Sequence, residues 1–214
     1  MQEILIYDEI GPDWLGMVNA KWLREQMPAD KEPVTIRINS PGGDVVEGQA
    51  IYNILAGRSG GTTIKVDGLS ASIASYIMLA GDEIEIAENA MVMIHNAWAF
   101  SAGNADSHRN IAAVLDKFDD VLLSGYVARS SGKKNRLDFA DAMAKETWLS
   151  ASEAVEWGIA DRTGQPLKVA ACVAPGRYLN APEQVLNPEA AIKAQQRRQE
   201  ALKNRLRLLK AKST

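Results

Sequence analysis

The chain has 214 residues, 46% of them hydrophobic and 24% charged, with a formal net charge of −3. These values are typical of a globular protein that buries a real core, and we expect one domain plus an appendage. No run approaches the ~18–20 apolar residues that span a bilayer, and the first residues lack the basic region of a signal peptide.

The cysteine and histidine content points in the same direction. A single cysteine, Cys172, excludes an internal disulfide framework and suits a reducing cytoplasm. One cysteine and two histidines make a zinc site improbable. We therefore expect a cytoplasmic protein with no metal and no membrane association.

The charge is unevenly distributed along the chain. From Glu189 onward eight Lys and Arg stand against two Glu, so this part carries +6 and the remainder −9. A solvated basic helix explains this tail better than a nucleic-acid-binding segment does. We expect no nucleic-acid partner.

Apolar periodicity predicts alternating strands and helices along residues 1–165. Strands are predicted at residues 3–7, 34–38, 62–66, 83–88 and 91–94, and helices at 14–23, 45–55, 107–130, 137–145 and 151–157. A glycine-assisted turn and a buried helix are predicted within residues 68–81. This alternation favours a parallel sheet with crossover helices.

The segment that follows is different in character. Four prolines mark residues 166–188 as an extended connector, and residues 189–214 read as a basic helical tail with a short leucine stripe. The predicted domains are therefore 1–165, 166–188 and 189–214.

The stretch 68–81 organises the predicted site. It places a serine at the start of a helix, where unpaired backbone N–H groups favour negative charge. Ser70, Ser72 and Ser75 all occur there, and each can equally be an N-cap or a small packing residue. A nucleophilic serine needs a base in reach. His95 ends an apolar run beside the expected cleft, whereas His108 reads as a surface residue.

A second glycine turn, Asn39-Ser-Pro-Gly-Gly43, follows the second predicted strand. Ligands of parallel sheets collect at the carboxyl ends of the strands. Paired glycines let backbone N–H groups point into such a site, as an oxyanion hole requires, although the same residues also make plain turns.

Four sequence blocks occur in order between Ile4 and Gly164. They are Ile38-Asn-Ser-Pro-Gly-Gly43; Gly68-Leu-Ser-Ala-Ser72 with Ala80-Gly81 after it; Val92-Met-Ile-His95; and Leu149-Ser-Ala-Ser-Glu-Ala-Val-Glu-Trp-Gly-Ile-Ala-Asp161. Together they resemble the Clp protease proteolytic subunit family, ClpP. The variants Asp-Gly-Leu-Ser-Ala-Ser, Met-Ile-His-Asn and Glu-Thr-Trp-Leu-Ser are more similar to the ClpP-like head-maturation proteases of tailed phages.

The resemblance implies a ClpP/crotonase-like α/β fold of repeated β-β-α units and a serine endopeptidase without cofactor or metal. It implies Ser72 as nucleophile, His95 as general base, and the backbone of Gly43 and Ile73 as oxyanion donors. The family's third catalytic residue, an aspartate, falls on Glu146, a departure that leaves Asp141 or a Ser–His dyad as alternatives.

The resemblance also implies partners: a polypeptide substrate and a homo-oligomeric ring built on heptamers. The phage-like variants indicate capsid or scaffold proteins as substrates. The alternative is a housekeeping subunit working with an AAA+ unfoldase. Few residues precede the first strand and the tail has no counterpart in the housekeeping subunit, which weakens the case for that unfoldase.

Three rival functions stay open. Crotonase-type acyl-CoA enzymes share the oxyanion donors but need no Ser–His pair. Signal-peptide-peptidase-like enzymes use a Ser–Lys pair, which the Met-Ile-His block disfavours. The third rival is a catalytically silent, ring-forming assembly protein.

Overall fold

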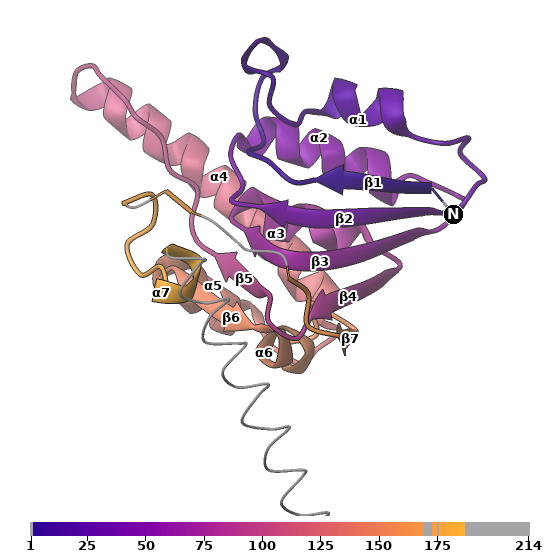
Figure 1. Ribbon diagram of the computed structural model, residues 1–214. Coiled ribbons are helices and arrows are strands. Elements are labelled where there is room, and N and C mark those ends of the chain that lie inside the picture. Colours follow the sequence, from indigo (N-terminus) through magenta and orange to yellow (C-terminus); the bar gives the residue numbers. More distant parts are fainter. Residues whose placement is uncertain (1, 169–172, 175, 187–214) are drawn as a thin grey trace, which may run out of the picture. The chain divides into compact units, whose positions relative to one another are not determined.

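The computed structural model describes residues 2–168, 173–174 and 176–186, and the chain divides into two compact units, Met1–Leu167 and Lys168–Thr214 (Figure 1). The strands are β1 (Gln2–Ile6), β2 (Val34–Ser40), β3 (Thr62–Ala71), β4 (Glu83–Ala87), β5 (Met91–Ile94), β6 (Thr147–Ser150) and β7 (Arg162–Gly164). The helices are α1 (Ala20–Gln26), α2 (Val45–Ala56), α3 (Ile73–Ile77), α4 (Ala105–Ser130), α5 (Arg136–Ala144), α6 (Ala151–Glu156) and α7 (Glu183–Leu186), with 3-10 turns η1 (Asp13–Leu15) and η2 (Met78–Ala80).

The first unit is built on one mixed sheet. Its main order is β1-β2-β3-β4-β7, with every neighbouring pair parallel. The far end of β3 pairs instead with β5, also in parallel, and β6 runs antiparallel to β5. The predicted α/β fold with a parallel sheet is confirmed.

The two faces of the main sheet differ in chemistry. Apolar side chains on one face of the sheet form a core with α1, α2 and α3. The core includes Ile4, Ile6, Ile36, Ile38 and Ile64 from the strands, and Leu23, Ile51, Leu55 and Ile77 from the helices. The opposite face carries charged residues on adjacent strands, where Arg37 lies 3.5 Å from Glu3 and Lys65 lies 3.8 Å from Glu85. This alternation follows from the two-residue period of a strand.

Two sequence predictions about local structure are wrong. The helix predicted over residues 14–23 is a 3-10 turn followed by α1, because Gly16 adopts a left-handed conformation (φ 70°) and Asn19 caps a new helix by accepting from the Trp22 N–H. Trp14, assigned to a packed helix face, is 80% exposed.

The second is the strand predicted over residues 62–66, because β3 continues through Gly68 to Ala71. The chain then turns at Ser72 and enters the buried helix α3, so the turn and helix predicted within residues 68–81 are confirmed. The helix predicted at residues 151–157 is also confirmed as α6, which begins with a capping box between Ser150 and Glu153 and is followed by Gly158 with φ 77°.

In the second unit, the described residues include the short helix α7, and the Val173 N–H donates to the Val185 carbonyl at 3.1 Å. The predicted connector is thus not extended throughout. The predicted tail helix, 189–214, lies outside the described residues. Across the described part of the chain, no helix has the length and apolar character needed to cross a membrane.

Candidate active site

Ser72 lies where β3 gives way to α3. Its backbone has φ 55° and ψ −129°, a conformation rare for a residue with a side chain. The Ser72 N–H donates to the Met93 carbonyl of β5 at 2.9 Å, which continues the parallel pairing of β3 with β5 by one step. The sharp change of direction after Ala71 leaves the Ser72 side chain partly exposed at the carboxyl end of the sheet.

His95 follows directly after β5 and lies beside Ser72. The Ser72 Oγ and His95 Nε2 are 2.7 Å apart, within hydrogen-bond distance. The contact arises because β3 and β5 are parallel neighbours whose carboxyl ends meet at one edge. Two side chains 23 residues apart thus form a hydroxyl–imidazole pair of the kind used in nucleophilic catalysis.

The other candidate side chains lie elsewhere. Ser70 is fully buried in β3, opposite Val92 of β5. Ser75 is fully buried and donates through Oγ to the Ser72 carbonyl at 2.5 Å. His108 is exposed in the first turns of α4, with its Nδ1 2.8 Å from the Ser101 Oγ. Ser70 and Ser75 are therefore buried within the fold, and the Ser101–His108 contact is a second hydroxyl–imidazole pair that lies on the exposed surface, outside the turn at Ser72.

The glycine turn at residues 39–43 lies against the turn at Ser72. Gly42 has φ 83°, and a Cβ there would be 2.5 Å from the Ala71 carbonyl oxygen and 2.7 Å from the Ser72 Cβ. Gly43 has φ 151°, and its Cβ would be 1.9 Å from the Ile10 carbonyl oxygen. Both positions therefore require glycine, for conformation and for space.

Backbone hydrogen bonds fix the direction in which Gly43 points. The Ile10 N–H donates to the Gly42 carbonyl at 3.0 Å, and the Asp44 N–H donates to the Ile10 carbonyl at 2.8 Å. In this parallel bridge the Gly42 carbonyl and the Asp44 N–H point toward Ile10. Because successive peptide groups of an extended chain alternate in direction, the Gly43 N–H points away from Ile10. Ile73 is the first residue of α3, so its N–H has no acceptor within the helix.

Glu146 lies next to the end of the β5–β6 ladder. The last pair of this antiparallel ladder is Ile94 with Thr147, so the next residue on each side is His95 and Glu146. Glu146 has φ 51°, and its Oε1 accepts from the Trp148 Nε1–H at 3.4 Å. Asp141, on α5, is exposed and accepts from the Lys145 Nζ at 2.6 Å.

One supporting side chain was missed by sequence reasoning. The Asp119 Oδ1 of α4 accepts from the Ala97 N–H at 2.6 Å, two residues beyond His95. Burial, followed by the nearby Asp116 charge, raises the pKa of Asp119, while the Ala97 N–H lowers it. No sequence signal marks Asp119, because its partner is a backbone group in a loop of irregular conformation.

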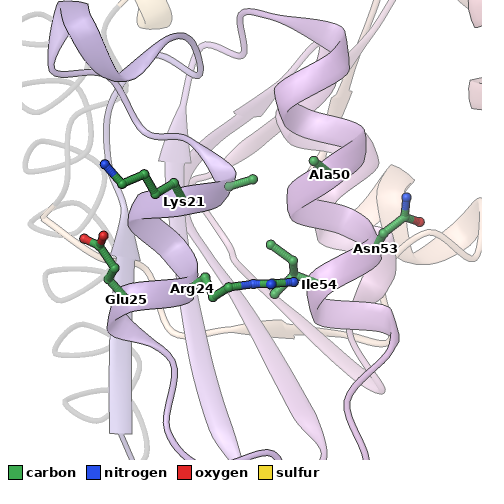
Figure 2. A pocket seen from close by; sticks show the side chains of 7 residues that line it. Lys21, Arg24, Glu25, Ala50, Asn53 and Ile54 are labelled. Atoms are coloured by element: carbon green, nitrogen blue, oxygen red, sulfur yellow. The ribbon is translucent and has the colours of Figure 1, made fainter.

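A groove of about 730 Å³ lies away from this site, between α1 and α2. Figure 2 shows Arg24 of α1 and Ile54 of α2 pointing toward each other across it. It contains neither Ser72 nor His95. Within the described residues, no group of three or more His, Cys, Asp or Glu side chains is placed to hold a metal ion.

Comparison with known proteins agrees with this geometry. A sequence model of the Clp protease family matches residues 1–166. The chain is 31% identical over 166 residues to the ATP-dependent Clp protease proteolytic subunit 2 of Tropheryma whipplei (strain Twist), covering 75% of this chain and 91% of that protein. It is also 31% identical over 130 residues to the ATP-dependent Clp protease proteolytic subunit of Bacteroides fragilis, covering 60% of this chain and 62% of that protein.

The matched region contains the whole sheet, the Ser72–His95 pair and the glycine turn beside it. It is also more than half of the chain. The chain therefore belongs to the Clp protease family.

Proposed function

We propose that this protein is a serine endopeptidase in which Ser72 and His95 perform the chemistry. The observation that carries the proposal is the 2.7 Å contact between the Ser72 Oγ and the His95 Nε2. With the imidazole proton on Nδ1, Nε2 accepts the hydroxyl proton as Oγ attacks the carbonyl carbon of a peptide bond.

The remaining steps use the same two side chains. His95 returns the proton to the leaving amine, the C–N bond breaks, and an ester with Ser72 remains. Water then gives a proton to His95 and attacks the ester carbonyl. The bond to the Ser72 oxygen breaks, the carboxylic acid product is released, and the Ser72 oxygen takes the proton back from His95. The N–H groups of Gly43 and Ile73 are proposed to bind the oxyanion of each tetrahedral intermediate.

We assign the third catalytic role to Glu146. It is the next residue opposite His95 as the β5–β6 ladder ends, which supports a role for its carboxylate in orienting the imidazole. Asp141 is less suited, because its carboxylate is exposed and engaged by Lys145. A Glu can orient a histidine as Asp does.

The substrate is proposed to be a polypeptide, and the phage-like sequence variants favour capsid or scaffold precursors of a phage head. The relatives named above are ATP-dependent Clp proteolytic subunits, so a housekeeping subunit is the second candidate. A head-maturation protease should cleave its structural precursor without ATP or an unfoldase. A housekeeping-type subunit should leave folded proteins intact until an ATPase is added.

The assembly is proposed to be a heptamer-based ring. Apolar side chains Val114 and Val121 of α4 are about half exposed in the isolated chain, which favours burial by a second copy. Light scattering at micromolar concentration should give a mass several times 23.3 kDa. A monomer contradicts this part of the proposal.

Peptide hydrolysis by matched variants tests the chemistry. Ser72→Ala and His95→Ala should each lower kcat by about four or more orders of magnitude, because the two residues act as a unit. Glu146→Gln should lower kcat by up to about 10⁴-fold, whereas Asp141→Asn should match the unsubstituted protein. An inactive Asp141→Asn beside a fully active Glu146→Gln would reverse the assignment of the third residue.

A further inference from the structure

Ser72 is held by hydrogen bonds from two sides. Its N–H is bound to β5 through Met93, and its carbonyl accepts from both the Ser75 N–H, at 2.9 Å, and the Ser75 Oγ, at 2.5 Å. The φ and ψ of Ser72 are unfavourable for a residue with a side chain, and such a conformation persists only where surrounding contacts enforce it. The Ser75 side chain is one of those contacts.

The Ser75 hydroxyl has a second partner, which comes from the long helix α4. The Ser75 Oγ lies 2.6 Å from the Tyr126 hydroxyl oxygen, and both residues are buried. A hydroxyl has one proton, and Ser75 gives its proton to the Ser72 carbonyl. The proton between the two hydroxyls therefore belongs to Tyr126, which donates to Ser75.

The result is a directed chain, from Tyr126 O–H to Ser75 O–H to the Ser72 carbonyl. Each bond polarises the next in such a chain. Burial raises the pKa of Tyr126, so its hydroxyl stays a donor throughout the neutral pH range. The chain links the nucleophile to α4, an element 51 residues further along the sequence than Ser75.

The Tyr126 ring is itself fixed in place. It stacks on Phe139 of α5, with ring centroids 5.6 Å apart and planes 17° apart, and meets Tyr76 of α3 edge-on at 6.3 Å. Next to it, Gly125 lets α4 approach closely, because a Cβ there would be 2.4 Å from the Tyr76 ring. The position of α4 is thereby transmitted to the Ser72 backbone through packed groups rather than a flexible loop.

We propose that Tyr126 and Ser75 are positioning residues, which hold the Ser72 backbone in its reactive conformation and make the activity of the site depend on the placement of α4. The proposal rests on the proposed function of Ser72. It concerns the orientation of Oγ toward His95 rather than contact with the substrate.

The test compares Tyr126→Phe with Tyr52→Phe in the full-length protein. Tyr52 belongs to the same aromatic cluster, its ring centroid 4.6 Å from that of Tyr76, but its hydroxyl is not part of the chain. Active sites are first titrated with a fluorophosphonate, so that kcat refers only to folded, reactive protein. Tyr126→Phe should lower kcat per titrated site about three- to tenfold, the loss expected for one hydrogen bond, with KM for a short peptide unchanged.

A double-mutant comparison separates positioning from general loss of packing. Ser75→Ala should give a reduction similar to that of Tyr126→Phe, and the double variant should be no slower than the slower single variant, because both remove one chain. A kcat per site for Tyr126→Phe equal to that of Tyr52→Phe, or strictly multiplicative effects, would overturn the inference. If the unsubstituted protein neither reacts with the probe nor cleaves peptides, the proposed function fails instead.

Discussion

At the scale of single residues, the site depends on backbone positions that few side chains tolerate. Ser72 has φ 55° at a turn whose neighbouring residues, Ala71 and Ile73, are buried. Gly42 and Gly43 lie beside it with φ 83° and 151°. The hydroxyl of Ser40, also buried, donates to the Asp8 carbonyl at 2.6 Å and accepts from the Gly42 N–H at 3.1 Å. These contacts hold the glycine turn beside Ser72 in the absence of substrate, as the proposed oxyanion stabilisation requires.

A glycine pair on the protein offers a matched test of this alignment. Gly42 and Gly132 have nearly equal φ, 83° and 85°, but a Cβ at Gly132 would meet no atom within 4 Å. Gly132→Ala should cost only the left-handed strain, about 1–2 kcal/mol, with peptide hydrolysis unchanged.

Gly42→Ala should suffer the same strain and, in addition, push against Ala71 and Ser72. We expect a larger loss of thermal stability and a loss of kcat of about 10²-fold or more, similar to the loss of one oxyanion donor, because the shifted turn displaces the Gly43 N–H. Melting curves and peptide hydrolysis check both variants. Equal kcat values for the two variants contradict the account of the glycine turn.

At the scale of elements, the sequence identified the longer strands and helices, in which apolar residues recur with a clear period. Strand β2 was recognisable from its β-branched run, and the carboxyl-end placement of its glycine turn followed from the parallel sheet. Strands β6 and β7 were not predicted, because they have four and three residues and depend on pairing with β5 and β4. Without β6, the position of Glu146 rested only on the family resemblance.

Local interactions decided the other differences. The side chain of Asn19 caps α1, and the prediction for residues 14–23, made from apolar spacing alone, did not take this local interaction into account. The extension of β3 beyond residue 66 was not predicted, because glycine normally marks turns. Here Gly68 lies within the strand, and the serine that follows Ala71 adopts the positive φ of the turn.

One prediction at this scale concerns the link between α4 and the loop after His95. The pKa of Asp119 is raised in the folded protein, chiefly by burial, so its ionisation is less favourable there than in the unfolded chain. This carboxyl therefore favours folding most at low pH, and the benefit is lost as the pH rises through its raised pKa.

Asp119→Asn keeps an acceptor for the Ala97 N–H but cannot ionise. Relative to the unsubstituted protein, its melting temperature should therefore rise between pH 4 and pH 7. Lys145→Gln, which removes a surface charge from α5, is the control for general charge effects. A difference in melting temperature that stays constant with pH, or that falls, contradicts this assignment.

At the scale of the whole molecule, the described parts of the chain place the complete Ser72–His95 site in the first unit. That unit ends at Leu167, which is anchored to Asn89 by two hydrogen bonds of 2.8 and 2.9 Å. The segment from Glu189 onward, with its net charge of +6, belongs to the second unit. We infer that the second unit serves recruitment or assembly rather than peptide-bond cleavage.

Truncation after Leu167 tests this division. Hydrolysis of short peptides should stay within about twofold of the full-length value, because no catalytic group is removed. Processing of the natural protein substrate should weaken and lose its sensitivity to salt, since exposed charges are screened within about 10 Å at 0.1 M salt. A truncated protein that fails to fold or to cleave peptides shows that the division is wrong.

The central claim is that the serine at the end of β3 is an activated nucleophile. The most direct measurement is reaction of the full-length protein with a fluorophosphonate, followed by mass spectrometry of its proteolytic fragments. The account predicts one adduct, on Ser72, which is absent from Ser72→Ala and His95→Ala but present in Ser70→Ala and Ser75→Ala. An adduct on another serine, or none on protein that is folded and assembled, would contradict it.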